Sequence, residues 1–325
     1  MTSTLLTVEQ LGVAFAGKPP LPILRDIGFA LAPGETLGIV GESGSGKSLL
    51  ALALMGLLPE TARAEGSIRF EGHDLLSCGE KKLTQLHGNR IGMIFQEPLT
   101  ALNPAMTVGD QIAEGMVWHK GIGWKEARRE AVRLLSQVRM TTAAEMAKRY
   151  PHELSGGQRQ RVCIAMAIAM KPALLIADEP TTALDVTVQA HILDLLRELV
   201  QDNAMALILI SHDLGVVAEL CTRSLVLYAG RQMEEAPTRA LLDRPRNPYT
   251  RALIRALPRR HTQQRPATLQ AIAGAVPDFA HLPKGCSFTT RCPRCIDACA
   301  TTLPGWRVDA NGRGNRCLLD ERDAP

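Results

Sequence analysis

The sequence contains, at residues 41–48, the stretch Gly41-Glu42-Ser43-Gly44-Ser45-Gly46-Lys47-Ser48, which fits the pattern G-x-x-x-x-G-K-[S/T]. The apolar run Thr36 to Val40 precedes it and predicts a strand, and Lys47 to Leu58 predicts a helix. In that context the glycines allow backbone N–H groups to surround phosphates, and the helix N-terminus favours negative charge. We therefore expect a phosphate-binding loop, in which Lys47 reaches the β- and γ-phosphates of a nucleotide and the Ser48 hydroxyl ligates Mg²⁺.

Short apolar runs alternate with helical patterns over the first 235 residues, which predicts an α/β fold with a mostly parallel sheet covered by helices. The expected strands are Ile91 to Phe95, Leu174 to Ala177 and Ala206 to Ile210, and helices are expected between Thr107 and Tyr150 and from about Val188 to Val200. Beyond Arg244 the chain is rich in Pro, Arg and Cys and shows little periodicity. We place a domain boundary near residue 236.

The strand at Leu174 to Ala177 ends in two carboxylates, Asp178 and Glu179. Adjacent strand positions face opposite ways, so the two acids are expected to do different work. Asp178 suits the second shell of Mg²⁺, and Glu179 suits the residue that orients and polarises the attacking water. His212 and Gln96 also follow apolar strands, where contact with phosphate or metal is one reading and a structural hydrogen bond is the other.

A further motif decides between these readings. Leu154-Ser155-Gly156-Gly157-Gln158 resembles the signature of the ATP-binding cassette family. The family's other motifs stand in the same order, with Walker A at 41–48, the Q-loop at Gln96, Walker B at 174–179, the D-loop at Ala183-Leu184-Asp185 and the switch at His212. The resemblance covers about residues 5 to 235.

This resemblance implies a P-loop NTPase fold of ABC type, with a mixed sheet, an antiparallel β edge and a helical subdomain at about residues 97–160. It implies an ATPase in which Glu179, His212 and Gln96 act in catalysis and Mg²⁺ is held through Ser48, Gln96 and Asp178. ATP would be bound by Phe15, stacked on adenine, together with Gly41, Glu42, Ser43, Gly44, Ser45, Gly46, Lys47 and Ser48. A core phenylalanine is the alternative for Phe15. In the head-to-tail dimers of the family, Ser155, Gly156, Gly157 and Gln158 would contact the partner's nucleotide. Asp185 is the D-loop residue.

The C-terminal part narrows the choice within the family. Asn247-Pro248-Tyr249-Thr250-Arg251-Ala252-Leu253 and Leu282-Pro283-Lys284-Gly285-Cys286-x-Phe288-x-x-Arg291-Cys292-Pro293 resemble the extension of oligopeptide, dipeptide and nickel importer ATPases. The similarity implies a cassette domain at 1–236 and an extension at 237–325, in a motor subunit of a bacterial peptide importer of the first-ATPase type. Nickel or a metal chelate is the alternative cargo. A soluble cassette ATPase of repair or translation and an exporter subunit are the less favoured alternatives.

Composition agrees with a peripheral subunit. Hydrophobic residues make up 46% and charged residues 22%, and no apolar run reaches the length of a membrane span. The N-terminus lacks a secretory signal pattern. The resemblance implies a place on the cytoplasmic face of the inner membrane. The implied partners are a second, related ATPase subunit, two transmembrane permeases and, through the complex, a solute-binding protein; nucleic acid is not expected.

Cysteine and positive charge both gather near the C-terminus. Five of the eight cysteines lie in the last 40 residues, and 14 Lys or Arg stand against four Asp or Glu between Arg239 and Arg316. Such a cysteine cluster favours metal over disulfides in a cytosolic protein, and the spacing suits either zinc or a cluster. Resemblance to peptide-importer ATPases implies a [4Fe–4S] cluster on Cys286, Cys292, Cys299 and Cys317, with Cys295 as the departure from the pattern. We expect positive neighbours such as Arg291 and Arg313 to lower the pKa values of these thiols.

Overall fold

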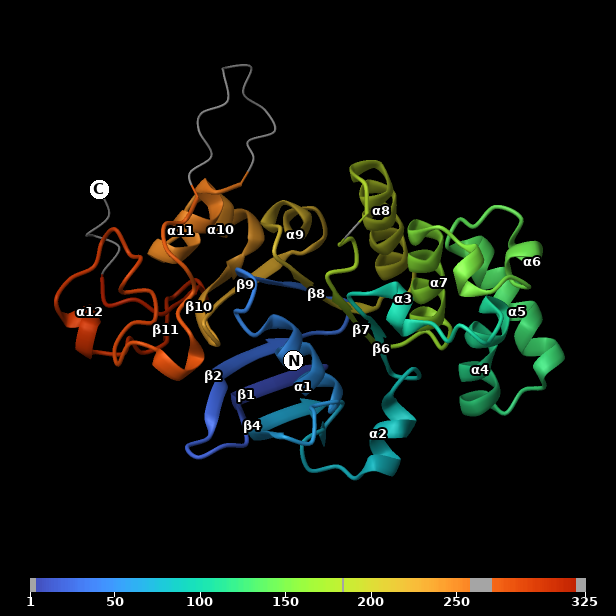
Figure 1. Ribbon diagram of the computed structural model, residues 1–325, viewed down its shortest axis with the longest axis horizontal. Coiled ribbons are helices and arrows are strands. Elements are labelled where there is room, and N and C mark those ends of the chain that lie inside the picture. Colours follow the sequence, from blue (N-terminus) through green and yellow to red (C-terminus); the bar gives the residue numbers. More distant parts are fainter. Residues whose placement is uncertain (1–3, 183, 258–270, 320–325) are drawn as a thin grey trace, which may run out of the picture. The chain divides into compact units, whose positions relative to one another are not determined.

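A computed structural model describes residues 4–182, 184–257 and 271–319 (Figure 1). Ala183 of the expected D-loop lies outside these residues. The chain divides into two compact units, one formed mainly by Leu31–Glu35 and Ser77–Leu209 and the other by Leu5–Ala30, Thr36–Leu76 and Ile210–Pro325. Each contains part of the α/β architecture expected from the sequence.

The first unit contains helices and three strands, which lie in the sheet in the order β8-β7-β6. The strands are β6 (Ile91–Ile94), β7 (Leu174–Asp178) and β8 (Ala206–Ser211), and β6 pairs with β7 in parallel. The helices are α2 (Glu80–Leu86), α3 (Pro98–Ala101), α4 (Val108–Lys120), α5 (Trp124–Gln137), α6 (Ala143–Met146), the 3-10 helix η1 (Pro151–Glu153), α7 (Gly156–Ile168) and α8 (Val186–Asp202). Helices α3 to α7 lie together, in green, in Figure 1. This all-helical region contains most of the expected helical subdomain.

The second unit has an antiparallel sheet in the order β2-β1-β4-β5 and a mixed one in the order β11-β12-β10-β9-β3. Its first half contains β1 (Leu6–Phe15), β2 (Leu21–Leu31), β3 (Thr36–Val40), α1 (Lys47–Met55), β4 (Ala62–Phe70) and β5 (His73–Asp74). Its second half contains α9 (Leu214–Leu220), β9 (Arg223–Tyr228), β10 (Arg231–Pro237), α10 (Thr238–Asp243), α11 (Pro248–Arg255), the 3-10 helix η2 (Phe279–His281), α12 (Ala298–Thr301), β11 (Arg307–Val308) and β12 (Gly314–Asn315).

Strand β3 connects the expected loop to this unit's core. All five of its residues are buried, and it pairs in parallel with β9. Helix α1 ends at Met55, three residues before the expected Leu58, because Gly56 adopts a left-handed conformation with φ 64° and caps the helix. The expected strand and helix therefore flank the loop, with a shorter helix.

The C-terminal extension is built into the same unit. Strand β12 pairs with β10 through Glu234 and Glu235, and β11 pairs with β12. The rings of Tyr228, Tyr249 and Phe288 pack against one another with centroids 4.5 to 5.3 Å apart. Because Tyr228 comes from β9 and the other two from the extension, these rings form a shared apolar core.

Candidate nucleotide-binding site

The loop from Gly41 to Gly46 joins β3 to α1 in the second unit. Gly46 has φ 99°, a region that L-residues with side chains rarely adopt. A Cβ at Gly41 would collide with the carbonyl oxygen of Leu227 on β9. These two positions explain why the loop requires glycine at both of its ends.

Lys47 folds back over the loop that precedes it. Its Nζ donates to the carbonyl oxygens of Gly41 at 2.9 Å and Glu42 at 3.0 Å, and the residue is 5% exposed. Ser45 Oγ is buried and has no hydrogen-bond partner among the described residues, whereas Ser48 is exposed in the first turn of α1. The loop thus places an ammonium group, a buried hydroxyl and a helix N-terminus together, as phosphate binding requires.

Phe15 lies at the end of β1, half-buried, and lines a pocket of about 650 Å³ on the antiparallel sheet. Leu24 lines the same pocket, and its side chain lies 2.7 Å from the position that a Cβ on Gly46 would take. Leu24 therefore lies between the pocket and the loop, and no loop residue lines the pocket itself. A ring at its edge is available for stacking on an adenine, which favours the expected role over a fully buried core position.

In the first unit the structure brings Gln96 and Glu179 together. Gln96 Nε2 donates to Glu179 Oε2 at 3.1 Å, and Thr182 Oγ1 donates to the same oxygen at 2.8 Å. Glu179 directly follows β7, whose last residue, Asp178, is 5% exposed. The carboxylate of Glu179 is thus oriented by two donors while remaining partly open to solvent.

The signature residues begin helix α7. Ser155 is the N-cap: its Oγ accepts from the N–H of Gln158 at 3.3 Å, and Gln158 Oε1 accepts from the N–H of Ser155 at 2.9 Å. A Cβ on Gly157 would lie 2.8 Å from Val188 Cγ1, so α7 approaches α8 closely there. Ser155 and Gly156 are exposed. The N-terminus of a 13-residue helix therefore faces solvent at these two residues.

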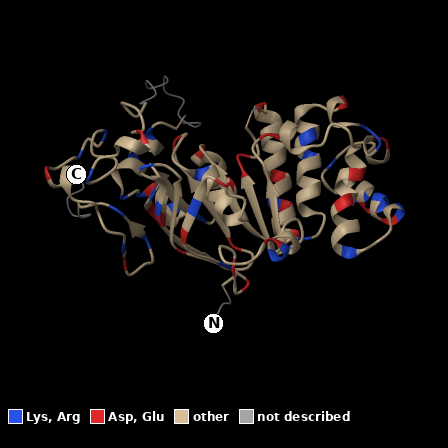
Figure 2. Ribbon diagram, turned by 60° about the horizontal axis from the view of Figure 1, so that its bottom comes forward, with Lys and Arg blue, Asp and Glu red and all other residues tan. Residues whose placement is uncertain are grey.

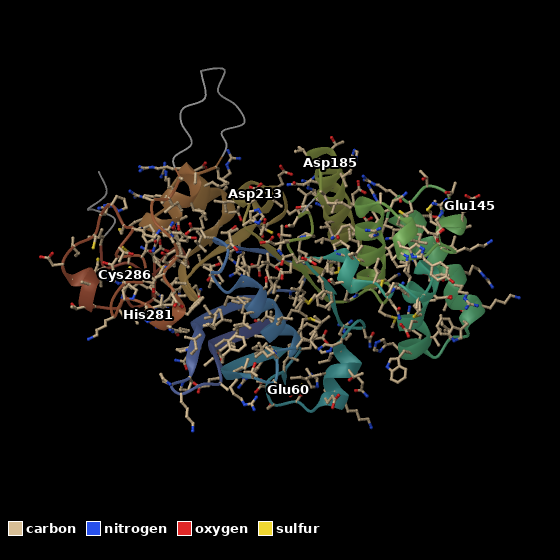
Figure 3. All side chains as sticks on the ribbon, viewed as in Figure 1. Glu60, Glu145, Asp185, Asp213, His281 and Cys286 are labelled. Atoms are coloured by element: carbon tan, nitrogen blue, oxygen red, sulfur yellow. The ribbon has the colours of Figure 1, made fainter. Side chains whose placement is uncertain are left out.

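Two further expected residues lie at element ends. Asp185, labelled in Figure 3, caps α8 by accepting from the N–H of Val188 at 2.9 Å. His212 is exposed and directly follows β8, and the next residue, Asp213, caps α9. Both predicted polar residues therefore stand where a strand or loop gives way to a helix.

Four cysteines of the extension line one cavity, of about 20 Å³: Cys286, Cys292, Cys299 and Cys317. Cys286 N–H donates to the carbonyl oxygen of Cys299 in α12 at 2.8 Å, which holds two of their segments together. Cys295 is exposed and does not line this cavity. In the described parts of the chain, no group of three or more His, Cys, Asp or Glu residues could hold a metal ion.

The expected effect of positive charge on these thiols is wrong. Burial raises the pKa of Cys286 to about 11 and also raises the pKa values of Cys292 and Cys317, so desolvation outweighs the arginines. At Cys317 the guanidinium of Arg294 acts to lower the pKa, but burial outweighs it.

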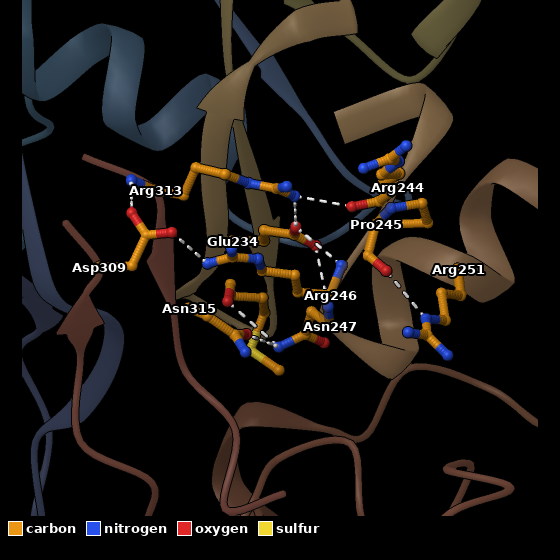
Figure 4. A network of polar contacts seen from close by, with 10 residues as sticks. Glu234, Arg244, Pro245, Arg246, Asn247, Arg251, Asp309, Arg313 and Asn315 are labelled. Atoms are coloured by element: carbon orange, nitrogen blue, oxygen red, sulfur yellow. Dashed lines mark hydrogen bonds and ion pairs between the residues drawn. The ribbon is translucent and has the colours of Figure 1, made fainter. Parts of the chain in front are cut away.

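Several arginines of the extension are engaged instead with acids nearer the N-terminus. Arg313 contacts Glu234 at 3.2 Å, within the polar network of Figure 4, and Arg316 contacts Asp26 at 2.7 Å. Figure 2 shows positive and negative residues interspersed along the ribbon. The positive excess of the extension is therefore used partly in ion pairs that attach it to the rest of its unit.

Two residues at the loop were not predicted. Arg291 binds the carboxylate of Glu42 through both terminal nitrogens, and Tyr249 Oη accepts from the N–H of Glu42 at 3.0 Å. Hydrogen bonding to Glu42 raises the pKa of Arg291, so the guanidinium stays charged. Because 249 residues separate Arg291 from Glu42, no local pattern indicates this pair.

None of the described helices is both long enough and apolar enough to cross a bilayer.

Comparison with known proteins agrees with the motifs. Residues 24–182 match the family described as ABC transporter, and residues 233–299 match the oligopeptide/dipeptide transporter, C-terminal region.

Two curated relatives resemble almost the whole chain. The oligopeptide transport ATP-binding protein AppD of Bacillus subtilis is 45% identical over 324 residues, which cover 99% of this chain and 98% of AppD. The oligopeptide transport ATP-binding protein OppD of Salmonella typhimurium is 49% identical over 317 residues, which cover 97% of this chain and 94% of OppD.

Solved structures agree at the level of the cassette. The ATP-binding cassette MJ0796, in a dimeric post-hydrolysis state with ADP and Pi, is 26% identical with a TM-score of 0.65 and covers 72% of this chain and 99% of its own. CbiO1 from Clostridium perfringens, part of an ABC transporter complex, is 28% identical with a TM-score of 0.63 and covers 74% of this chain and 91% of its own. Because these relatives are 45–49% identical to it over nearly its full length, the chain belongs to the ABC transporter family, and it carries the C-terminal region of oligopeptide and dipeptide transporters.

Proposed function

We propose that this chain is the ATP-hydrolysing subunit of a bacterial importer that takes up di- and oligopeptides. One observation carries the proposal: at 45–49% identity the relatives named as oligopeptide transport ATP-binding proteins match both the cassette and the C-terminal extension. The loop at 41–48, with its ammonium, buried hydroxyl and helix N-terminus, supports ATP as the substrate.

The chemistry proposed for each residue follows from its group. Lys47 neutralises the β- and γ-phosphates, and the oxygens of Ser48, Gln96 and Asp178 suit Mg²⁺, which prefers hard oxygen ligands. Bound there, the ion would neutralise phosphate charge. Glu179, oriented by Gln96, accepts a proton from the attacking water.

Other residues contact the nucleotide at its two ends. His212 contacts the γ-phosphate, and Phe15 stacks on adenine in the pocket that its ring lines.

The signature would complete the site of a second cassette. The exposed Ser155 and Gly156 at the start of α7 support a role in binding an anion on another subunit. Gly157 and Gln158 belong to the same proposed surface, and Asp185 is the proposed D-loop residue. In this arrangement each ATP lies between the loop of one subunit and the signature of the other, and a related second ATPase is the proposed partner.

We further propose a nucleotide-binding domain at 1–236, with a helical subdomain at about 97–160, and an extension at 237–325. Two permeases and, through them, a solute-binding protein complete the importer. The chain would then lie on the cytoplasmic face of the inner membrane and pass the motion of the region between Gln96 and Tyr150 to a permease helix.

We also propose a [4Fe–4S] cluster, as a structural or regulatory group, on the four thiols that line the cysteine cavity, which as they stand in the described residues do not form a group that could hold a metal ion. Its donors are four thiols, Phe288, Leu318 and Leu319 shield it, and the fifth cysteine of the extension stands outside it. A cavity of about 20 Å³ has room for roughly one water, so a cluster requires the thiols to move apart.

Anaerobic purification tests this assignment. Iron near four per chain is expected, retained in Cys295→Ser and lost in Cys292→Ser or Cys299→Ser. Stoichiometric zinc without iron would replace the cluster by the alternative metal.

Assembly tests the proposed function. The chain alone should hydrolyse ATP slowly, because the partner supplies half of each site. Co-expression with the two permeases and the second ATPase should yield a membrane-bound complex with higher turnover, stimulated by peptide-loaded binding protein. Full activity of the chain as a soluble monomer would contradict it, and stimulation by nickel chelates instead of peptides would change the cargo.

A further inference from the structure

Glu42, the second residue of the loop, is bound by the C-terminal extension through both its side chain and its backbone. Arg291 Nη1 donates to Oε2 at 2.7 Å and Nη2 donates to Oε1 at 2.9 Å, a bidentate pair. The N–H of Glu42 donates to the hydroxyl of Tyr249 at 3.0 Å. The N–H of Glu42 is therefore already engaged in a hydrogen bond to the extension.

The geometry of Arg291 leaves it little freedom. Its side chain is 3% exposed. Nε donates to the Ala273 carbonyl at 2.9 Å, Nη2 also donates to the Ile272 carbonyl at 3.2 Å, and Nη1 also donates to the Tyr228 hydroxyl at 3.2 Å. All five guanidinium N–H groups thus have acceptors. The rings of Tyr228 and Phe288 lie 5.8 and 5.9 Å from its central carbon. Because every N–H donor of Arg291 is engaged, the guanidinium holds the carboxylate that it binds in one position.

The pair matters electrically because the loop is the place proposed for a polyanion. The Glu42 side chain is only 25% exposed, so water screens its charge incompletely. An unpaired carboxylate there would repel nucleotide phosphates. With Arg291 bound to both oxygens, the pair carries no net charge and the carboxylate is held on the extension.

The same contacts fix the shape of the loop. The carbonyl of Glu42 accepts from Lys47 Nζ, whereas its N–H and carboxylate are bound to the extension. When Lys47 donates to phosphates, its hydrogen bonds to the loop weaken. Arg291 and Tyr249 then remain to hold Glu42 in place.

We propose that the C-terminal extension is part of the nucleotide site, in which Arg291 and Tyr249 are positioning residues that hold and neutralise Glu42 and so set how tightly the loop binds nucleotide. This inference rests on the proposed assignment of residues 41–48 as the nucleotide loop. It gives the extension a direct role in the ATP site.

The test is the affinity of the purified full-length chain for Mg-ADP and for a non-hydrolysable Mg-ATP analogue, measured by titration calorimetry. Arg291→Gln should weaken binding about tenfold, because it leaves a partly buried carboxylate unpaired beside the phosphates. The double variant Glu42→Gln/Arg291→Gln should recover to within about threefold of the wild type, since the repelling charge is gone. A loss of binding caused only by disturbed folding of the extension would not be rescued in this way.

Two further variants keep the result interpretable. Tyr249→Phe keeps the ring in its packing and removes only the acceptor of the Glu42 N–H, and it should weaken binding about threefold to fivefold even where Arg291→Gln proves unstable. Arg255→Gln makes the same change of charge at an exposed position of α11 and should bind as the wild type does.

Wild-type affinity in both Arg291→Gln and Tyr249→Phe, or a double variant no better than Arg291→Gln, would overturn the inference. Lys47→Ala distinguishes the assignment of residues 41–48 as the nucleotide loop from the role proposed for the extension. If it still binds nucleotide as the wild type does, the assignment of the loop itself is wrong, whereas if it alone loses binding, only the role of the extension fails.

Discussion

At Glu179 the backbone leaves β7 with φ 46°, a conformation that residues other than glycine rarely adopt. The carboxylate then accepts from both Gln96 and Thr182. Residues held in such conformations cluster at functional sites, where the surrounding contacts impose them. The strained backbone and the two hydrogen-bond donors support Glu179 as the general base that accepts a proton from the attacking water.

Glu179→Gln should therefore separate binding from hydrolysis. The amide keeps the size of the side chain but cannot accept the proton of water, so ATP hydrolysis by the assembled transporter should fall at least about 100-fold. Nucleotide affinity should stay within about threefold of the wild type. Phosphate release and nucleotide binding measure the two, and a turnover near that of the wild type would remove Glu179 from this role.

Two buried thiols predict how stability depends on pH. Burial raises the pKa values of Cys163 and Cys221 to about 12, from an ordinary value of 9.0. Well below pH 9 both are protonated in the folded and the unfolded state, and as the pH rises through 9 towards 12 the unfolded chain loses these protons first. The free energy of unfolding should then fall, by up to about 2.7 kcal/mol per pH unit for the two together. Urea denaturation at pH 8 and 10 measures it. Cys163→Ala/Cys221→Ala should show a smaller loss of stability with pH, and an unchanged loss would exclude these thiols.

At the scale of elements, the caps of the helices explain much of what local sequence predicts. Ser155 with Gln158 forms a capping box at α7, Thr107 caps α4 and Asp185 caps α8. Ser155 and Asp185 are also proposed site residues, whereas Thr107 is not. Ser155 and Thr107 are therefore a matched pair of N-caps, whose substitution distinguishes an effect on stability from an effect on activity.

Ser155→Ala and Thr107→Ala should each destabilise the chain by about 1 kcal/mol through the loss of an N-cap. Only Ser155→Ala should reduce ATP hydrolysis in the assembled complex, because its hydroxyl lies at the surface proposed for the partner's nucleotide. Thermal denaturation and ATPase assays of both variants measure this. Equal hydrolysis in the two would leave Ser155 as a cap alone.

The strands β3, β6, β7 and β8 and helix α8 occur where the apolar periodicity of the sequence predicts them, within one or two residues. Local patterns suffice there because each strand is a short buried run with polar residues at its end. The end of α1 was less predictable, because the left-handed cap at Gly56 interrupts an apolar run that continues to Leu58.

At the scale of the whole molecule, the sequence predicts the order of the motifs but not how the extension attaches. The sequence places Arg291 and Arg313 near the cysteines, yet they are bound to acids that precede them by 249 and 79 residues. Arg316 is likewise bound to Asp26, 290 residues before it. Periodicity and motifs describe neighbours along the chain, so such pairs emerge only from the fold. The extension is therefore joined to the cassette region by buried and half-buried ion pairs as well as by strand pairing.

Transport by the reconstituted complex tests directly whether this chain couples ATP hydrolysis to peptide uptake. The measurement is accumulation of a labelled oligopeptide by proteoliposomes that contain the two permeases, both ATPase subunits and the binding protein, with ATP on the cassette side. We expect ATP-dependent accumulation that is lost when Lys47→Ala replaces the wild-type chain. Peptide accumulation that persists without ATP, or that is unaffected by Lys47→Ala, would contradict it.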